Sequence, residues 1–231
     1  MKYLFLLAIL SLVNTVSAQQ TGTFRFYEID TYGEDSDTLI VDIAQTKGKF
    51  KINIEWGNGS KEYFILDSST QKVLELLDLQ AGKTAHFTAL DGKTSIIYAA
   101  TTAGNMATMY QQFWIKYNLL EEYKTINEFK CQKIEVLDRG NVVGYGWVAL
   151  DLHIGYANDC GFYYLKEGTL LEYSKLDAHS GANYELRLIS SSNTLSKPET
   201  VFSQTVPAGY KVEEYNWEEH YSSGESAPES E

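Results

Sequence analysis

Acidic side chains gather in the stretch DTYGEDSD, which holds Asp30, Glu34, Asp35 and Asp37. Several carboxylates on one flexible loop between strands can bind Ca²⁺ at the concentrations found outside cells. The spacing differs from that of an EF-hand, in which oxygen ligands alternate along the loop and a glutamate closes the site. The four residues are therefore a candidate calcium site, and a solvated charged turn is the alternative interpretation.

The chain contains two cysteines, Cys131 and Cys160. In an oxidising compartment, two cysteines are the number that makes one disulfide. Closing a loop of about thirty residues would contribute roughly 3 to 4 kcal/mol. The alternative is free or intermolecular thiols. If the bridge forms, no cysteine is left to act as a nucleophile.

The nearest approach to a catalytic pair is Asp151 with His153. On a strand these side chains would share a face, and a carboxylate that orients an imidazole is the start of a catalytic or metal site. A polar pair on the solvated face of a strand is the simpler interpretation. The serine-hydrolase elbow, the phosphate-binding glycine loop and the zinc-protease helix motif are all absent from the sequence. We therefore assign no catalytic residue and expect no cofactor other than calcium.

Aromatic residues lie beside carboxylates and amides in the stretches GFYYL, VVGYGW and EYNWEEHY. Such mixtures can stack on sugar faces and bind their hydroxyl groups, but aromatic rings are also the main core material of β-sheet proteins. Trp147 and Tyr163 would be core residues in the second interpretation. Asn58 begins the sequon Asn-Gly-Ser, which predicts glycosylation if the host is a eukaryote.

The N-terminal residues 1–18 have the pattern of a secretory signal peptide: Lys2, an apolar run from Leu4 to Val13, and a small-residue ending at Ala18. No second apolar run approaches the roughly 20 residues that a membrane-spanning helix needs. The net charge of −12 opposes binding to nucleic acid or to anionic lipid. We expect a secreted, extracellular protein that neither inserts in a membrane nor binds nucleic acid.

The composition favours strands as the elements that must position these residues, with 17 Tyr, 10 Phe, 17 Gly and 3 Pro. In FKINIEW, at residues 50–56, apolar and polar residues alternate, which predicts a half-buried strand. The following Gly-Asn-Gly predicts a hairpin turn to a strand over 63–66. The stretch 73–90 predicts two extended pieces, or a turn of helix followed by a strand, because Gly82 interrupts any continuous helical period.

Four blocks of the first half recur in the same order in the second half. For example, the stretch 73–90 matches 170–188, and Ile52 to Leu66 matches Leu152 to Leu165. We interpret this as a tandem duplication of about a hundred residues. The alternative is a chance likeness between strands of similar composition. The pattern around the glycine break resembles the corner of a fibronectin type III module over about twenty residues per copy.

The sequence thus predicts an all-β protein of two tandem antiparallel β-sandwich modules, immunoglobulin- or fibronectin-III-like, over residues 19–125 and 126–217. A disordered acidic tail is expected over 218–231, where glutamate and serine prevail. In this arrangement Cys131 and Cys160 would be neighbours in the second module.

For function, we expect a non-enzymatic extracellular binding, adhesion or matrix protein whose partner is an extracellular protein or a glycan. A secreted hydrolase acting on glycans is one alternative. A small-molecule carrier is another, and it would require the two copies to close around one cavity.

Overall fold

The computed structural model describes residues 21–32, 35–70, 72–89, 115–154, 168–176 and 183–213. The predicted signal peptide, the acidic tail over 218–231, Glu34, Cys160 and Tyr163 lie outside the described residues. Within the described ranges, no helix is long and apolar enough to cross a membrane.

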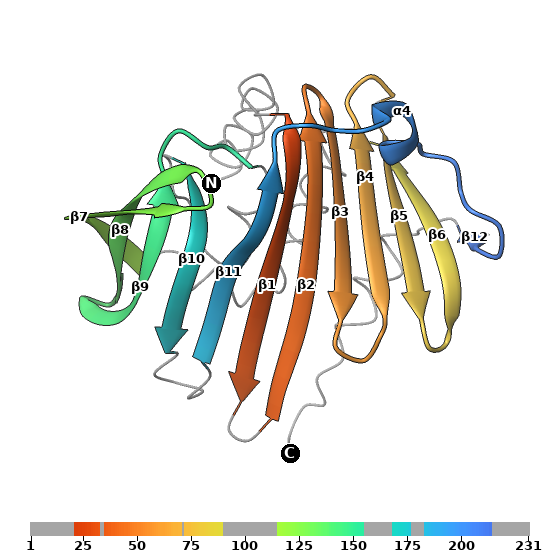
Figure 1. Ribbon diagram of the computed structural model, residues 1–231. Coiled ribbons are helices and arrows are strands. Elements are labelled where there is room, and N and C mark those ends of the chain that lie inside the picture. The colour runs from red at the N-terminus through yellow and green to blue at the C-terminus, as the bar shows by residue number, and fades with distance from the viewer. Residues whose placement is uncertain are drawn as a thin grey trace, which may run out of the picture.

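The described strands form one twelve-stranded sheet with the order β12-β6-β5-β4-β3-β2-β1-β11-β10-β9-β8-β7 (Figure 1). Neighbouring strands are antiparallel except for β12, which runs parallel to β6. The strands are β1 Gly22–Tyr32, β2 Asp35–Thr46, β3 Lys49–Trp56, β4 Lys61–Asp67, β5 Lys72–Leu79, β6 Gly82–Ala89, β7 Ile115–Ile126, β8 Phe129–Asp138, β9 Asn141–Ala149, β10 Thr169–Leu176, β11 Asn183–Ser192 and β12 Lys211–Glu213.

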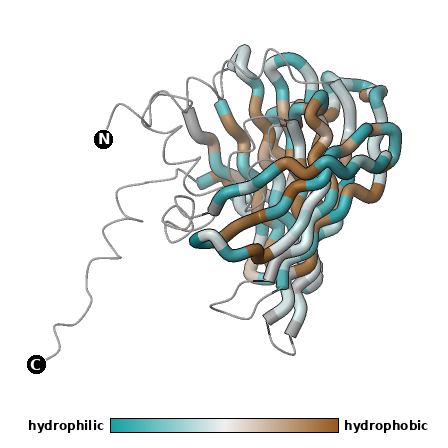
Figure 2. The backbone as a smooth tube through the Cα atoms, turned by 90° about the vertical axis from the view of Figure 1, so that its left-hand side faces the viewer, coloured by the Kyte–Doolittle hydropathy of each residue, from teal (hydrophilic) through white to brown (hydrophobic). Residues whose placement is uncertain are grey.

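The alternation of apolar and polar residues predicts the strands of the first half correctly. Ile52 and Ile54 of β3 are buried, whereas Lys51, Asn53 and Glu55 on the other face are only partly covered. Brown and teal segments accordingly alternate along the strands in Figure 2. The hairpin from β3 to β4 is also confirmed.

The stretch 73–90 forms the hairpin of β5 and β6, as the glycine break predicts. Leu79 pairs with Gly82 at its closed end. The φ angle of Gly82 is 146°, a backbone conformation that residues with a Cβ rarely adopt. A continuous helix is therefore impossible here.

The two expected sandwich modules are not confirmed, because β1 of the first half pairs with β11 of the second half. The register runs from Thr23 opposite Ser192 to Thr31 opposite Asn183, with one bulge after Arg25. The other edge of β1 pairs with β2. Both hydrogen-bonding edges of β1 are thus occupied, and the halves share one sheet.

The expected module boundary at residues 125 and 126 falls inside a hairpin. Ile126 ends β7 and pairs with Phe129, the first residue of β8. Residues 115–126 form the strand β7. A boundary at this point would divide the paired strands β7 and β8 between two units.

Two of the four matched blocks lie in described strands that occur in the same order along the sheet. Read from β6 to β1 and then from β11 to β8, the hairpin β5–β6 corresponds to β10–β11, and residues 24–29 of β1 correspond to residues 129–134 of β8. A duplicated meander joined edge to edge would have this order. The match between 118–123 of β7 and 210–215 departs from this order, because β12 lies beside β6. The duplication stays a prediction, with the two copies now placed in one sheet.

The sheet buries apolar side chains on both faces. One face, the core face, carries a cluster that extends from Ile52 and Phe26 to Leu186 and Ile134. The opposite face is crossed by residues 193–210, which we call the strap and which contain the short helix α4, Pro198–Val201. Under the strap, Phe202 packs with a second cluster: Ala44, Ile65, Leu74, Leu76 and Ala85. We call this second side the strap face.

Residues 152–154 tie the two halves together away from the strands. The buried Gln45 of β2 donates from Nε2 to the carbonyl of His153 at 2.9 Å. Thr169 Oγ1 donates to the carbonyl of Leu152 at 2.7 Å and accepts from the Ile154 amide at 2.9 Å. The backbone polar groups of this buried segment are thus satisfied by side chains.

Replacing Phe26 by Ala should destabilise both halves together. The Phe26 ring is fully buried on β1, and its loss should lower the free energy of unfolding by about 3 to 4 kcal/mol. Because β1 links the halves, amide hydrogen exchange should accelerate in β9 and β10 as well as in β2 and β3. Val142→Ala, at a 48% exposed side chain, is the control. Unchanged exchange in β9 and β10 would show that the halves unfold independently.

Candidate binding pocket

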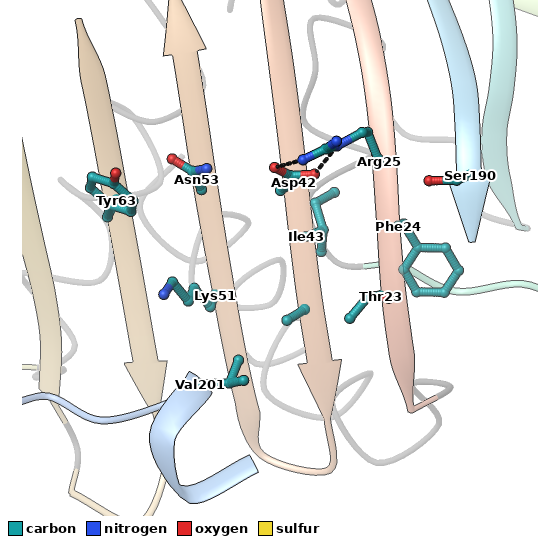
Figure 3. A pocket seen from close by; sticks show the side chains of 11 residues that line it. Thr23, Phe24, Arg25, Asp42, Ile43, Lys51, Asn53, Tyr63, Ser190 and Val201 are labelled. Atoms are coloured by element: carbon teal, nitrogen blue, oxygen red, sulfur yellow. Dashed lines mark hydrogen bonds and ion pairs between the residues drawn. The ribbon is translucent and has the colours of Figure 1, made fainter. Parts of the chain in front are cut away.

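A pocket of about 400 Å³ opens on the strap face, between the middle strands and helix α4 (Figure 3). Its size lies in the range of small-molecule sites. The lining residues come from β1, β2, β3, β4, β11 and α4: Thr23, Phe24, Arg25, Asp42, Ile43, Ala44, Lys51, Asn53, Tyr63, Ser190 and Val201.

Strand register brings the polar lining residues into two neighbouring rows. Arg25 is opposite Asp42, Asp42 is opposite Asn53, and Asn53 is opposite Tyr63. In the next row, Ala44 is opposite Lys51. Residues directly opposite each other in antiparallel strands project from the same face. Side chains that are well separated in the sequence therefore meet on one surface.

Arg25 and Asp42 form a two-point ion pair at one side of the pocket. The Arg25 Nε donates to Oδ1 at 2.6 Å, and a terminal guanidinium nitrogen donates to Oδ2 at 2.7 Å. The hydrogen bond to Asp42 raises the pKa of Arg25 above its ordinary value. Fork-to-fork pairing fixes both side chains and neutralises both charges.

Lys51 is the second cation of the pocket, and its environment differs from that of Arg25. The side chain is half-buried, and Nζ lies 5.8 Å from the centre of the Tyr63 ring. Burial lowers the pKa of Lys51. Among the described residues, no carboxylate forms an ion pair with Lys51. The pocket thus holds one positive charge that these residues do not neutralise.

Asn53 adds an unsatisfied acceptor to the same surface. Its Oδ1 is buried and has no hydrogen-bond partner in the described part of the chain. A buried polar atom without a partner costs about 1 to 3 kcal/mol. A ligand that donates a hydrogen bond to Oδ1 would recover this cost.

The strap forms the wall beside Val201 and is held down by polar and apolar contacts. Gln204 Nε2 donates to the carbonyls of Ile65 at 3.0 Å and of Lys72 at 2.8 Å, while its Oε1 accepts from Thr70 Oγ1 at 2.8 Å. Phe202 is 3% exposed in the second cluster. After the strap, β12 pairs with β6. The strap is therefore attached to the sheet on both sides of Val206.

Chemically, this arrangement can hold a small molecule, with a cation and hydrogen-bonding groups on the sheet and apolar contacts from Ala44 and Val201. The described lining residues contain no histidine or cysteine. The hydroxyls of Thr23, Ser190 and Tyr63 thus have no imidazole base in the lining.

A titratable residue outside the pocket, Glu75, lies on the core face of the sheet. Glu75 of β5 is opposite Phe64 of β4 and His86 of β6, and Glu62 is a diagonal neighbour. Burial, followed by repulsion from Glu62, raises the pKa of Glu75 to about 7. Burial also raises the pKa of Glu62. Both carboxyls therefore hold a proton more readily than they do in water.

The candidate calcium residues belong to strand ends rather than to a loop. Asp30 is paired with Asp37, and Asp35 is paired with Tyr32, at the end of the β1–β2 hairpin. Glu34 lies outside the described residues. In the described ranges, no group of three or more His, Cys, Asp or Glu residues is placed to hold a metal ion. The calcium site stays a prediction that needs Glu34.

Cys131 is buried and forms no disulfide with a described residue, and its Sγ donates to the carbonyl of Phe129 at 3.4 Å. Burial raises the pKa of this thiol, which disfavours the reactive thiolate. The partner of the expected disulfide, Cys160, is not among the described residues. The bridge therefore stays a prediction.

Asn58 is exposed in the turn between β3 and β4, where a glycan could be accommodated. Its Oδ1 accepts a hydrogen bond from the Ser60 amide at 2.8 Å. Asp151 is exposed and precedes the buried Leu152, past the end of β9 at Ala149. Asp151 and His153 therefore do not share a strand face, which corrects that expectation.

Trp147 is partly buried and packs against the core cluster, as the core interpretation predicts. Lys124 Nζ lies 4.5 Å from the centre of its ring. Tyr145 is 47% exposed, and Lys133 Nζ lies 5.1 Å from its ring centre. A sugar stacking on Tyr145 would have to compete with this lysine.

The pocket residues are absent from the sequence-based candidates. Alternation predicts that Lys51 and Asn53 point away from the core face, and this is correct. The alternation alone does not reveal that the strap, about 150 residues further along the chain, covers part of that face. The signal in the sequence that could have indicated the pocket is a pair of polar residues, Lys51 and Asn53, on one strand. In the sheet they lie opposite Ala44 and Asp42 of the neighbouring strand.

Gln204→Ala should loosen the strap. Removing three hydrogen bonds leaves acceptors of β4 and β5 with fewer donors, so the free energy of unfolding should fall by about 1 to 2 kcal/mol. Amide exchange over residues 195–210 should accelerate. Gln80→Ala, in the exposed β5–β6 turn, serves as the control. Wild-type exchange rates in the Gln204 variant would contradict the anchoring role.

Glu75 should make the protein less stable as the pH rises from about 4.5 to about 7. Because its pKa is raised from 4.5 to about 7 in the folded state, the folded chain binds more protons than the unfolded chain in this window. Glu75→Gln, which cannot ionise, should be more stable than the wild type by about 2 kcal/mol at pH 8.

At pH 4 the difference between Glu75→Gln and the wild type should nearly vanish, because both side chains are then neutral. Urea unfolding at the two pH values measures the change. Glu128→Gln, at an exposed glutamate in the β7–β8 turn, is the matched control. A stability difference that does not vary with pH would refute the raised pKa.

No protein-family model and no curated protein matches the sequence. Among solved structures, an uncharacterized conserved protein from Thermus thermophilus aligns with a TM-score of 0.45 and 10% identity, over 90% of this chain and 98% of the other. MucB aligns with a TM-score of 0.41 and 8% identity, over 88% of this chain and 64% of MucB. A second MucB structure is a complex with MucA from Pseudomonas aeruginosa.

A putative outer membrane lipoprotein-sorting protein domain from Vibrio parahaemolyticus aligns with a TM-score of 0.35 and 11% identity, over 86% of this chain and 96% of that domain. All these proteins are distant from this chain, with TM-scores of 0.45 or less. The functional conclusions below therefore rest on the residues of this chain alone.

Proposed function

We propose that this chain is a secreted, non-enzymatic binding protein that holds a small molecule between the strap and the sheet. The observation that carries the proposal is the pocket of about 400 Å³ lined by a half-buried Lys51 and by Asn53, whose Oδ1 has no hydrogen-bond partner among the described residues. Polar and charged groups that lack a partner raise the free energy of the empty pocket. A ligand that pairs with them removes this cost.

Secretion is supported by the signal-peptide pattern of residues 1–18. The single sheet favours the small-molecule carrier over two independent adhesion modules, because the pocket is lined by β11 of the second half as well as by β1 to β4 of the first. Residues from both halves therefore meet in one site.

Glycan or protein recognition by exposed aromatic side chains has weaker support. Tyr123 and Tyr145 are 56% and 47% exposed. Lys130 and Lys133 each lie 5.1 Å from one of these ring centres. The rings are thus partly occupied by the chain's own cations, whereas Asn53 Oδ1 has no partner among the described residues.

Ser190→Trp should abolish small-molecule binding by filling the pocket. Ser190 is an exposed residue of β11, so a larger side chain can enter the pocket without displacing the core. Two fluorophores serve as probes: the anion anilinonaphthalene sulfonate and the neutral phenylnaphthylamine. The wild type should bind at least one saturably, and Ser190→Trp should weaken that binding at least tenfold.

Ser174→Trp is the matched control, since Ser174 is an exposed strand serine of β10 outside the pocket. It should bind like the wild type. If the wild type binds neither probe, or if both tryptophan variants bind equally well, the pocket is not the site and the proposal is wrong.

A further inference from the structure

We propose that the pocket selects ligands that carry an anionic group, a carboxylate, sulfonate or phosphate, and that Lys51 binds this group. The inference rests on the proposed function and adds the chemical class of the ligand. The ligand would be a small organic acid whose body is apolar.

The first argument is the charge balance of the pocket. Asp42, the carboxylate of the lining, already makes two hydrogen bonds to Arg25. Lys51 has no ion-pair partner among the described residues, so the lining as a whole carries one net positive charge. An anion entering the pocket would neutralise that charge.

The second argument is the contrast between Lys51, which is half-buried, and the other described lysines of the first half. Lys47 and Lys72 also form no ion pair with a described residue, but both are exposed to water. Lys49 pairs with Asp67 at 2.7 Å, Lys61 with Glu55 at 3.2 Å, and Lys83 with Asp78 at 2.5 Å. Among the described lysines of the first half, Lys51 alone is partly buried and forms no ion pair with a described residue. Burial is the only cause that lowers the pKa of Lys51, and no neighbouring acid offsets it.

The third argument is the set of groups around Lys51. The Tyr63 ring lies beside its ammonium, and the Tyr63 hydroxyl can donate a hydrogen bond to an anion. Ala44 and Val201 offer apolar contact to the rest of the ligand. Asn53 Oδ1 would accept a hydrogen bond from a hydroxyl or amide group of the same molecule.

The partly dehydrated ammonium explains why the preference should be strong. Removing a cation from water without a partner is unfavourable, and the attraction between opposite charges is larger where water is partly excluded. The net charge of −12 repels anions from the rest of the surface. Selective binding of an anion by this protein would therefore be a property of the pocket.

The experiment compares anilinonaphthalene sulfonate with the neutral phenylnaphthylamine in fluorescence titrations of the full mature chain. The wild type should bind the anion at least tenfold more tightly. Lys51→Gln should lose this preference, and Lys51→Arg should retain most of it. Lys61→Gln, which removes the same charge from the neighbouring strand of the same face, should leave it unchanged. Circular dichroism checks that each variant is folded.

A pH titration gives an independent readout. Because burial lowers the pKa of Lys51 below 10.5 in the empty pocket, the preference for the anion should begin to weaken at a pH below that value. Equal affinities of the wild type for the two probes, both abolished by Ser190→Trp, would overturn the anionic preference and leave the proposed function intact. A preference that survives in Lys51→Gln would also overturn the inference. If the wild type binds neither probe, the proposed function itself fails.

Discussion

The architecture depends on the pairing of β1 with β11. This pairing joins the first and last long strands of the described sheet, and it places both halves of the chain in one hydrogen-bonded ladder. It also aligns Arg25 with Ser190 across the junction, which builds one side of the pocket. Without this ladder, β1 and β11 would each present an exposed edge, a feature that folded proteins avoid. The fold and the candidate site therefore both depend on the pairing of β1 with β11.

The strap converts an ordinary solvated sheet face into a partly enclosed surface. Phe202 buries the second apolar cluster, and Gln204 joins the strap to the backbone of β4 and β5. Polar residues of the neighbouring strands then lie at the edge of the region that the strap covers, where water reaches them only in part. Lys51 and Asn53 acquire their unusual environments in this way, because partial burial removes water and the neighbouring residues do not replace it fully.

Buried ionisable groups are accommodated in different ways on the two faces of the sheet. On the core face, Glu75 is covered, and its carboxyl takes up a proton more readily than it does in water. On the strap face, Arg25 is neutralised by Asp42, while Lys51 has no such partner among the described residues. The first arrangement couples stability to pH, and the second creates a requirement for an external anion. Both follow from placing ionisable groups on strands whose two faces are covered.

Local sequence patterns were sufficient to specify strand β3, the hairpin turn to β4 and the break between β5 and β6. The alternation in residues 50–56, the Gly-Asn-Gly turn and the break at Gly82 each specify local backbone geometry, and the structure confirms them. These signals are short-ranged, since the side-chain period and the turn conformation depend on neighbouring residues. Long-range packing determined that both halves share one sheet, that the strap covers one face, and that Lys51 meets Tyr63 and Asn53 beside the Arg25–Asp42 pair. The pairing of β1 with β11 joins residues that are far apart in the chain. A pattern of alternating residues indicates which face of a strand is buried, but it does not indicate which strand or segment lies against that face.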